Sequence, residues 1–265
     1  MNERSGTLFI VATPIGNLED ITLRAIRVLQ DVDLIACEDT RVTRHLLDHF
    51  EIKTPTVSYF QHSKLSKIDY LISELRSGKD IALISDAGTP AISDPGQELI
   101  ANIRQACHSE PFGLTQGKLR EESRSPKATV NKSAASPRSF ANAQDDIRVV
   151  PIPGPSALTA AASVSGMIEK EFYFAGFLPK KKGRQTELKK LSKLDVPIIM
   201  YESTLRLERT LADIKTYFDD KTEVFVAREM TKMFEEYWGG KIDEVLNDLK
   251  SHKLKGEIVL VVKKL

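Results

Sequence analysis

A short apolar run that stops at a rigid loop is the strongest constraint in this chain. Ile81–Ile84 is an unbroken apolar stretch, which is typical of a parallel strand buried on both faces. It is followed by Gly88–Gly96, where two glycines and two prolines within nine residues exclude a regular strand or helix. Ligands of open α/β sheets bind at the carboxyl ends of strands, so Asp86 and the amides around Gly88 are candidates to hold a small polar ligand. A tight turn in which Asp86 only accepts backbone hydrogen bonds is the alternative.

The rest of the first half alternates between strand and helix patterns. Such alternation is the signature of a mostly parallel sheet covered by helices. Thr22 is a plausible N-cap, and Gly78 is placed to end the helix that Ser63 opens. The pattern predicts strands at Thr7–Ala12, Asp33–Cys37, Thr56–Tyr59 and Ile81–Ile84, and helices after Thr22, up to about His49, from Ser63 and after Pro95.

Residues 105–146 lose all periodicity. They are rich in Ser, Arg, Lys, Asn, Gln and Pro and poor in branched aliphatic residues. A segment of this composition cannot bury enough surface to offset its chain entropy. We therefore predict a disordered surface insertion, and a solvated loop is favoured over an RNA contact made by its lysines and arginines.

Order resumes at Ile147–Ile152, a strand that enters a second Pro/Gly loop and a helix of small residues, Ala157–Val164. The chain after Glu171 is richer in strands, and its Glu235–Gly239 segment is expected to be antiparallel. We predict an α/β fold of two α/β domains with mostly parallel sheets, at residues 1–166 and 171–265. The other strands expected in the second domain are Glu171–Leu178, Pro197–Tyr201, Thr222–Ala227 and Gly256–Lys263.

The composition excludes several classes of protein. Lys and Arg total 38 and Asp and Glu total 37, so affinity for nucleic acid has to come from a local basic patch. Cys37 and Cys107 form no CxxC pair, and the histidines show no metal spacing, so neither a metal site nor a disulfide framework is expected. We see no signal peptide, and no apolar run approaches the length of roughly 20 residues that is needed to span a membrane. A cytoplasmic protein is expected.

Four loops carry a family resemblance: TPIGNLEDIT, CEDTR, SDAGTPAISDPG and PIPGPSA. Together they closely resemble the tetrapyrrole-methylase-like class of S-adenosylmethionine-dependent methyltransferases. Within that class they resemble the bacterial 16S rRNA (cytidine-2′-O)-methyltransferase family. The stretches GFLPKKKGR and REMTK are similar to the same family, and the order of the motifs matches over nearly the whole chain. The segment 105–146 departs from the family pattern, which has a short turn there.

The resemblance implies a cleft between the two domains that binds S-adenosyl-L-methionine, a homodimer, and 16S rRNA of the small ribosomal subunit as the partner. It places Asp86, Gly88 and Thr89 at the methionine part of the cofactor. The other cofactor-binding residues that it implies are Pro14 and Gly16 in the first loop, Ser156 and Ala157 along the pocket, and Tyr201, Glu202, Ala227 and Arg228 at the adenine and ribose.

Methyl transfer to a ribose hydroxyl requires alignment of the two reactants and help in removing a proton. Glu38 and Asp39 are the candidate acids or bases, and Arg41 and Lys232 are the candidate cations. The alternative for the Glu38–Arg41 stretch is a helix start whose acids face the positive end of the helix dipole.

A basic loop is the candidate RNA contact. Its residues are Lys180, Lys181, Lys182 and Arg184. Taken alone this motif favours a solvated turn, but a methyltransferase acting on rRNA needs phosphate contacts.

Two other functions stay open at this point: a tetrapyrrole methyltransferase of the same fold, and a non-catalytic RNA-binding protein. The polycationic loop and the EDTR loop argue against the first, because a macrocycle needs a wider apolar cleft. A P-loop nucleotide enzyme is excluded, since no GxxxxGK[ST] stretch is present.

Overall fold

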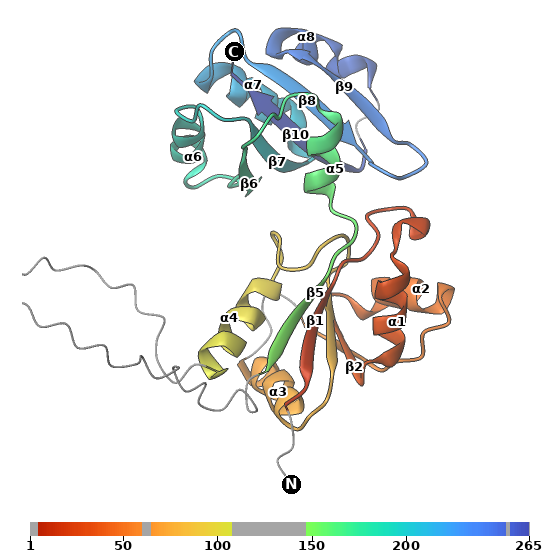
Figure 1. Cartoon of the computed structure of the whole chain (residues 1–265). Coiled ribbons are helices and arrows are strands. Elements are labelled where there is room, and N and C mark those ends of the chain that lie inside the picture. The colour runs from red at the N-terminus through yellow and green to blue at the C-terminus, as the bar shows by residue number, and fades with distance from the viewer. Residues whose placement is uncertain (1–4, 60–64, 108–146, 253–254, 265) are drawn as a thin grey trace, which may run out of the picture.

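The chain forms two lobes, each built on a five-stranded sheet (Figure 1). The computed structural model describes residues 5–59, 65–107, 147–252 and 255–264. The predicted helix start at Ser63 and nearly all of the predicted insertion 105–146 lie outside the described residues. Residues 105–107 form the last turn of a helix.

The first sheet has the strand order β3-β2-β4-β1-β5, and all of its described pairs are parallel. Every residue of the central strands β2 and β4 is buried, which explains the continuous apolar runs in the sequence. The strands are β1 (Thr7–Val11), β2 (Leu34–Cys37), β3 (Thr56–Ser58), β4 (Ile81–Ile84) and β5 (Arg148–Ile152). The helices are η1 (Leu18–Asp20), α1 (Leu23–Asp31), α2 (Thr40–His49), α3 (Leu65–Arg76) and α4 (Gly96–Cys107).

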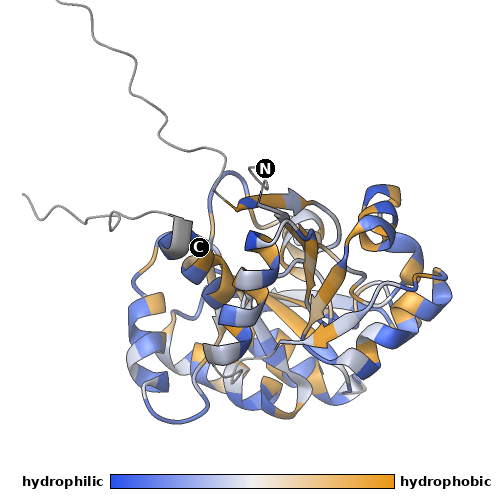
Figure 2. Ribbon diagram, turned by 90° about the horizontal axis from the view of Figure 1, so that it is seen from below, coloured by the Kyte–Doolittle hydropathy of each residue, from blue (hydrophilic) through white to orange (hydrophobic). Residues whose placement is uncertain are grey.

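Helices cover both faces of this sheet. One core cluster joins the sheet to α3 and α4 through residues such as Leu71 and Leu99, and a second joins it to α1 and α2 through residues such as Leu29 and Leu47. Figure 2 shows the hydrophobic colour running along the strands, between helices of mixed colour. The predicted N-cap is confirmed, since the Thr22 hydroxyl accepts a hydrogen bond from the Ala25 N–H at 3.1 Å.

The second sheet is mixed, with the order β6-β7-β10-β8-β9. Only the β6–β7 pair is parallel among its described strands, so the prediction of mostly parallel pairing holds for the first sheet and not for this one. The strands are β6 (Tyr173–Phe177), β7 (Ile198–Ser203), β8 (Glu223–Arg228), β9 (Glu236–Lys241) and β10 (Glu257–Lys263). The short connection between β8 and β9 makes that pair antiparallel, because a parallel crossover needs a dozen residues or more. The last strand, β10, lies between β7 and β8 and is antiparallel to both. The helices are α5 (Ala157–Val164), α6 (Arg184–Leu191), α7 (Thr204–Tyr217), α8 (Ile242–Asp248) and η2 (Leu249–Ser251).

Helix α5 packs on the second sheet, although the sequence placed it in the first domain. Ala161 is fully buried in a cluster with Ile199 of β7 and Val259 of β10. Figure 1 shows α5 in the upper lobe, beside β10. The chain therefore crosses between the lobes at residues 153–156, earlier than the boundary at residue 166 predicted from the sequence. A helix of small residues has no single apolar face, so its pattern does not tell which sheet it covers.

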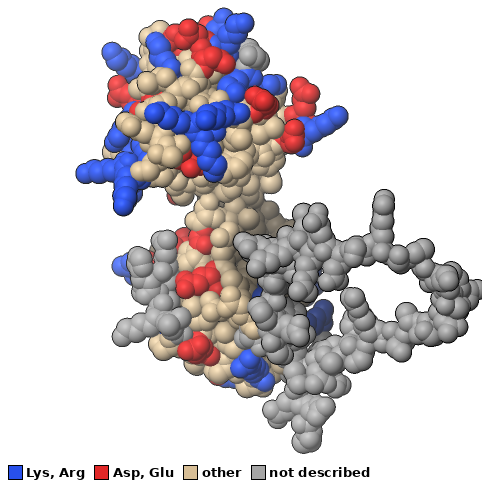
Figure 3. Space-filling view, turned by 90° about the vertical axis from the view of Figure 1, so that its left-hand side faces the viewer, with Lys and Arg blue, Asp and Glu red and all other residues tan. Residues whose placement is uncertain are grey.

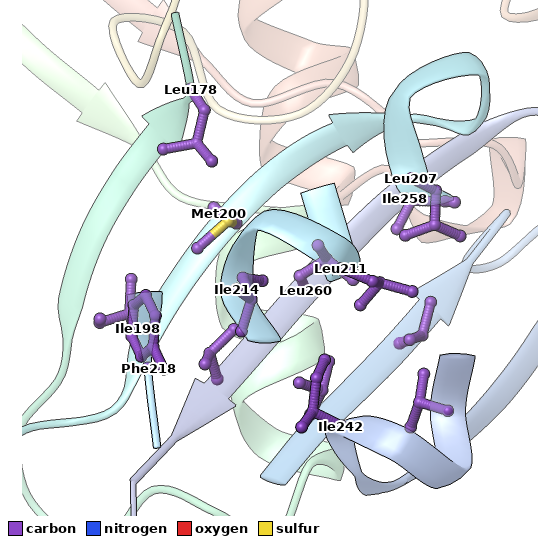
Figure 4. Packing of buried hydrophobic residues seen from close by; sticks show 14 of the residues in the cluster. Leu178, Ile198, Met200, Leu207, Leu211, Ile214, Phe218, Ile242, Ile258 and Leu260 are labelled. Carbon is purple, nitrogen blue, oxygen red and sulfur yellow. The ribbon is translucent and has the colours of Figure 1, made fainter. Parts of the chain in front are cut away.

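The opposite face of the second sheet is covered by α6, α7 and α8. Leu207, Leu211 and Ile214 of α7 lie over Met200 and Leu260 of the sheet (Figure 4). These side chains are fully buried and form the apolar centre of the second lobe.

A chain of buried polar contacts ties α6 to this centre. Arg184 is 3% exposed and donates to the Asp213 carboxylate at 2.7 Å and to the Thr210 hydroxyl at 2.8 Å. Thr210 in turn donates to Glu202 at 2.6 Å, and Arg206 pairs with the same carboxylate at 2.6 Å. The prediction that Arg184 contacts RNA is therefore not supported, because its guanidinium is buried and committed to these partners.

We expect Arg184→Ala to lower the free energy of unfolding of the second lobe by about 3 kcal/mol, since it leaves a carboxylate and a buried hydroxyl without their donor. Urea unfolding followed by the fluorescence of Trp238, the single tryptophan, measures this. Lys182→Ala, two residues earlier and exposed, is the control and should change stability by less than about 0.5 kcal/mol. Equal stabilities of the two variants would contradict the assignment.

Candidate functional site

Loops that follow four strands of the first sheet are bonded to one another at its carboxyl edge. Thr13 and Gly88 exchange two backbone hydrogen bonds, of 2.9 and 3.0 Å. The Thr89 hydroxyl donates to the carbonyl of Pro155 at 3.0 Å, and the Asp39 N–H donates to the Asp86 carboxylate at 3.0 Å. Because parallel strands end at the same edge, segments far apart in the sequence become one surface.

A cavity of about 510 Å³ lies between this edge and the second lobe. Both lobes contribute to its lining, as predicted for the cleft. Ten residues predicted from the sequence lie in its wall: Glu38, Asp86, Gly88, Thr89, Ser156, Ala157, Tyr201, Glu202, Ala227 and Lys232. Among the described residues, the predicted set Pro14, Gly16, Asp39, Arg41, Arg228, Lys180, Lys181, Lys182 and Arg184 lies outside this lining.

The wall from the first lobe is acidic. Burial raises the pKa of Glu38, and the nearby carboxylates of Asp86 and Asp94 raise it further. Burial also raises the pKa of Asp86, although the hydrogen bond from the Asp39 amide opposes this shift. Carboxylates that have lost part of their hydration beside a cavity are suited to hold a cation or to accept a proton.

Asp39 and Arg41 lie at the start of α2, where Asp39 caps the helix, and neither lines the cavity. The Asp39 carboxylate accepts the Arg41 N–H at 2.8 Å and pairs with the Arg41 guanidinium at 2.7 Å. These hydrogen bonds lower the pKa of Asp39 to about 2. The Arg41 side chain is 89% exposed. For these two residues the structure agrees with the capping alternative that the sequence left open.

Lys232 lines the cavity where the two lobes touch. Its ammonium pairs with Glu229 at 2.8 Å and with Glu257 at 3.0 Å. Its side chain passes so close to Gly16 that a Cβ at that position would collide with it. The neighbouring Thr231 hydroxyl accepts a hydrogen bond from the Asn17 N–H at 3.2 Å. Gly16 therefore permits the close approach of the lobes.

Two other predicted cofactor residues have structural contacts. Arg228 is 7% exposed, pairs with Glu236 at 2.9 Å and donates to the carbonyl of Lys255. Pro14 is buried in the first loop. The sequence also missed lining residues, and those that matter below are Ile15, Ile92, Asp94, Phe177, Met230 and Val259. All but Val259 lie within stretches that carry the family resemblance, although none of these residues was itself predicted to line the site, and Val259 lies in a predicted strand.

No helix in the described part of the chain is long and apolar enough to cross a membrane. Within those same ranges, no group of three or more His, Cys, Asp or Glu side chains is arranged to hold a metal ion.

The fold and the cleft define a class of protein. The Tetrapyrrole (Corrin/Porphyrin) Methylases family model matches residues 7–112 and 134–246, and the gap in the match lies within the predicted insertion. Solved structures with the same fold include the uroporphyrin-III-C-methyltransferase of Thermus thermophilus, with a TM-score of 0.60 and 18% identity over 98% of this chain and 94% of that one. Another is a cobalt precorrin-4 methyltransferase, with a TM-score of 0.62 and 13% identity over 97% of this chain and 94% of that one.

Curated relatives are much more similar in sequence. Ribosomal RNA small subunit methyltransferase I of Synechocystis is 41% identical over 97% of this chain and 78% of the relative. The protein of the same name from Thermotoga maritima is 40% identical over 97% of this chain and 98% of the relative. The chain belongs to the ribosomal RNA small subunit methyltransferase I family.

We expect Glu38→Gln to raise the melting temperature at pH 7. The folded pKa of Glu38 lies above its unfolded value, so its favourable contribution is present at low pH and is lost as the pH rises through the folded pKa. The gain should shrink as the pH falls towards 4.

We expect Asp39→Asn to lower the melting temperature at pH 7, the opposite of the change expected for Glu38→Gln. Its folded pKa of about 2 gives a favourable contribution above the unfolded pKa that disappears as the pH falls towards 2. Melting curves of both variants from pH 3 to 8 test the pair, and shifts of the same sign at pH 7 would refute the electrostatic account.

Proposed function

We propose that this protein transfers the methyl group of S-adenosyl-L-methionine to the 2′ hydroxyl of a cytidine in 16S rRNA of the small ribosomal subunit. The observation that carries the proposal is the cavity of about 510 Å³ with an acidic wall, in a chain about 40% identical to proteins named ribosomal RNA small subunit methyltransferase I. The homodimer, the cytoplasmic location and the choice of a cytidine 2′ hydroxyl stay predictions from the family resemblance.

The cavity fits a cofactor of this size and charge. Small-molecule sites generally measure about 300–1,000 Å³. S-adenosyl-L-methionine carries a sulfonium and an ammonium group, and Asp86 faces the cavity as a partly desolvated carboxylate. Tyr201, Ala227 and Val259 supply an apolar wall for the adenosine part. A Thermus thermophilus methyltransferase with this fold, 13% identical, has been solved in complex with S-adenosyl homocysteine. When bound, the cofactor supplies an electrophilic methyl group.

Glu38 is the residue best placed to remove the proton of the acceptor hydroxyl. It lines the cavity and its pKa is raised, so its carboxylate is a better base than an ordinary one. Asp39 is the weaker candidate, because its carboxylate is held by Arg41 at the helix start. Lys232 is held by Glu229 and Glu257 of its own lobe and lies against Gly16 of the first lobe, which suits a positioning role between the lobes.

The second lobe offers a surface for the RNA backbone. Lys180, Lys181 and Lys182 are exposed, and Arg209, with a side chain 62% exposed, lies with Lys181 around a smaller cavity of about 240 Å³. Figure 3 shows lysines and arginines gathered on the upper lobe on the α6 side. A local cluster of this kind is what a chain with a net charge of +1 needs to bind phosphates.

The two rival functions are less well supported. The tetrapyrrole and cobalamin enzymes are only 12–18% identical, so they are evidence for the fold alone. A non-catalytic RNA-binding protein would have no use for a desolvated carboxylate pair beside an interlobe cavity. Cofactor binding distinguishes this rival from the enzyme.

We expect Asp86→Asn to weaken binding of S-adenosyl-L-methionine by roughly 10–100-fold, the effect of losing a hydrogen bond to a charged group. Asparagine keeps an oxygen to accept the Asp39 N–H, so the loop is retained while the charge is removed. Isothermal titration calorimetry measures the affinity. Asp69→Asn, on the exposed side of α3, is the matched control. Equal affinities of the wild-type protein and Asp86→Asn would refute the role given to this carboxylate.

The decisive assay is ribose-methylation mapping of 16S rRNA in unmethylated small ribosomal subunits incubated with this protein. Glu38→Gln should lower kcat by about 10²–10⁴-fold, as expected for loss of a general base. In the wild-type protein, kcat should fall at low pH as Glu38 becomes protonated. Glu171→Gln, exposed and outside the cavity lining, should retain full activity. A Glu38→Gln variant with normal kcat would exclude Glu38 as the base.

A further inference from the structure

An exposed aromatic ring stands at the edge of the interlobe cavity. Phe177, the last residue of β6, is 56% exposed and lines the cavity. Its ring rests against Tyr201, with centroids 5.5 Å apart, and Tyr201 is in turn braced by Phe174 at 5.1 Å. Phe177 therefore presents a supported ring to solvent and not a freely moving one.

The first lobe meets β6 at this point. A Cβ built on Gly176 would lie 3.0 Å from the Ser93 hydroxyl, so the segment Ala91–Asp94 touches the end of β6. The neighbouring Ile92 is 40% exposed and lines the same cavity. The two exposed apolar side chains thus flank one contact between the lobes.

The segment Ala91–Asp94 of the first lobe has a strained backbone conformation. Ala91 and Ser93 have φ values of 66° and 68°, although neither is glycine. The Asp94 carboxylate holds this turn by accepting hydrogen bonds from the N–H groups of Ala91 at 2.9 Å and of Gly96 at 2.8 Å. Strain of this kind persists where surrounding contacts enforce it, and it is concentrated at functional sites.

The chain leads from Phe177 directly to the basic surface. Leu178 is buried, and Lys180 is exposed three residues after the ring. Three residues span about 10 Å at most, so the Cα atoms of Phe177 and Lys180 lie within about that distance of each other. An RNA strand whose phosphates lie along the lysines would pass the ring.

We propose that Phe177 is the platform on which an unpaired base of the substrate RNA stacks, beside the acceptor ribose, with Ile92 bounding the same opening from the first lobe. The inference rests on the proposed rRNA methylation and names the side chain that receives the base. Unpaired bases are recognised in RNA by stacking on aromatic side chains, and each such contact contributes about 1–3 kcal/mol. Stacking accepts any base, so Phe177 positions the nucleotide without selecting cytosine.

The test compares Phe177→Ala, Phe177→Tyr and Phe177→Trp. Filter binding to unmethylated small ribosomal subunits and steady-state methylation measure the RNA side, and calorimetry with S-adenosyl-L-methionine measures the cofactor side. We expect Phe177→Ala to weaken RNA binding and to raise KM by about 5–150-fold, with the cofactor Kd unchanged. Both aromatic variants should stay within about threefold of the wild-type protein.

Phe172→Ala is the matched control, because Phe172 is 38% exposed just before β6 and lies outside the cavity lining. It should leave both measurements unchanged. A Phe177→Ala variant with normal RNA affinity overturns the inference. A loss of cofactor affinity also overturns it, since the ring would then belong to the cofactor pocket.

Failure of the proposed function gives a different pattern. In that case the wild-type protein would methylate no 16S rRNA under any condition. The comparison of RNA affinity between wild-type protein and Phe177→Ala would still decide whether the ring receives a base.

Discussion

The pairing of Thr13 with Gly88 is the contact on which the site depends. Its two backbone hydrogen bonds join the loops after β1 and β4, and the contacts Thr89–Pro155 and Asp39–Asp86 add the loops after β5 and β2. Parallel strands deliver these loops to one edge, but only the bonds between them make a continuous wall. Gly88 allows the tight geometry, since its φ of 79° strains any residue with a Cβ. The same wall brings the carboxylates of Glu38 and Asp86 close together. The geometry that makes the cavity therefore also raises the pKa of Glu38.

The second lobe completes the cavity through contacts that need small residues at the boundary. Gly16 lets Lys232 pass, and Gly176 lets β6 reach Ser93, on two sides of the opening. The alanine-rich helix α5 follows the interlobe crossing and packs closely on β7 and β10. The lobes also share an apolar contact, because Ile15 of the first-lobe loop is buried in one cluster with Met230 and Val259 of the second lobe.

Local patterns in the sequence predicted the fold correctly where they reflect burial of a strand on both faces. Ile81–Ile84 predicted a central parallel strand, and the Pro/Gly loops predicted most of the cavity wall from the first lobe. They do not predict the role of a residue whose decisive partner is distant in the chain. Arg184 stands in a run of lysines, and nothing local shows that Asp213 and Thr210, more than twenty residues later, bury it. Likewise Phe177 ends a strand whose aromatic residues all look alike in sequence, and only the position of Tyr201 and the cavity distinguishes it.

The adjacent carboxylates of Glu38 and Asp39 show how one loop can serve two purposes. Asp39 points to the helix start, where Arg41 lowers its pKa to about 2 and fixes it as a cap. Glu38 turns into the cavity, where burial and two neighbouring carboxylates raise its pKa. Residue type and position in the sequence are nearly the same, so the environment alone separates a structural acid from a candidate base. The order of the two residues matters, because the cap has to be the residue next to the helix, which is Asp39. Glu38, which comes directly after β2, is then left to face the cleft. A chain that exchanged these orientations would lose the helix cap and the candidate base together.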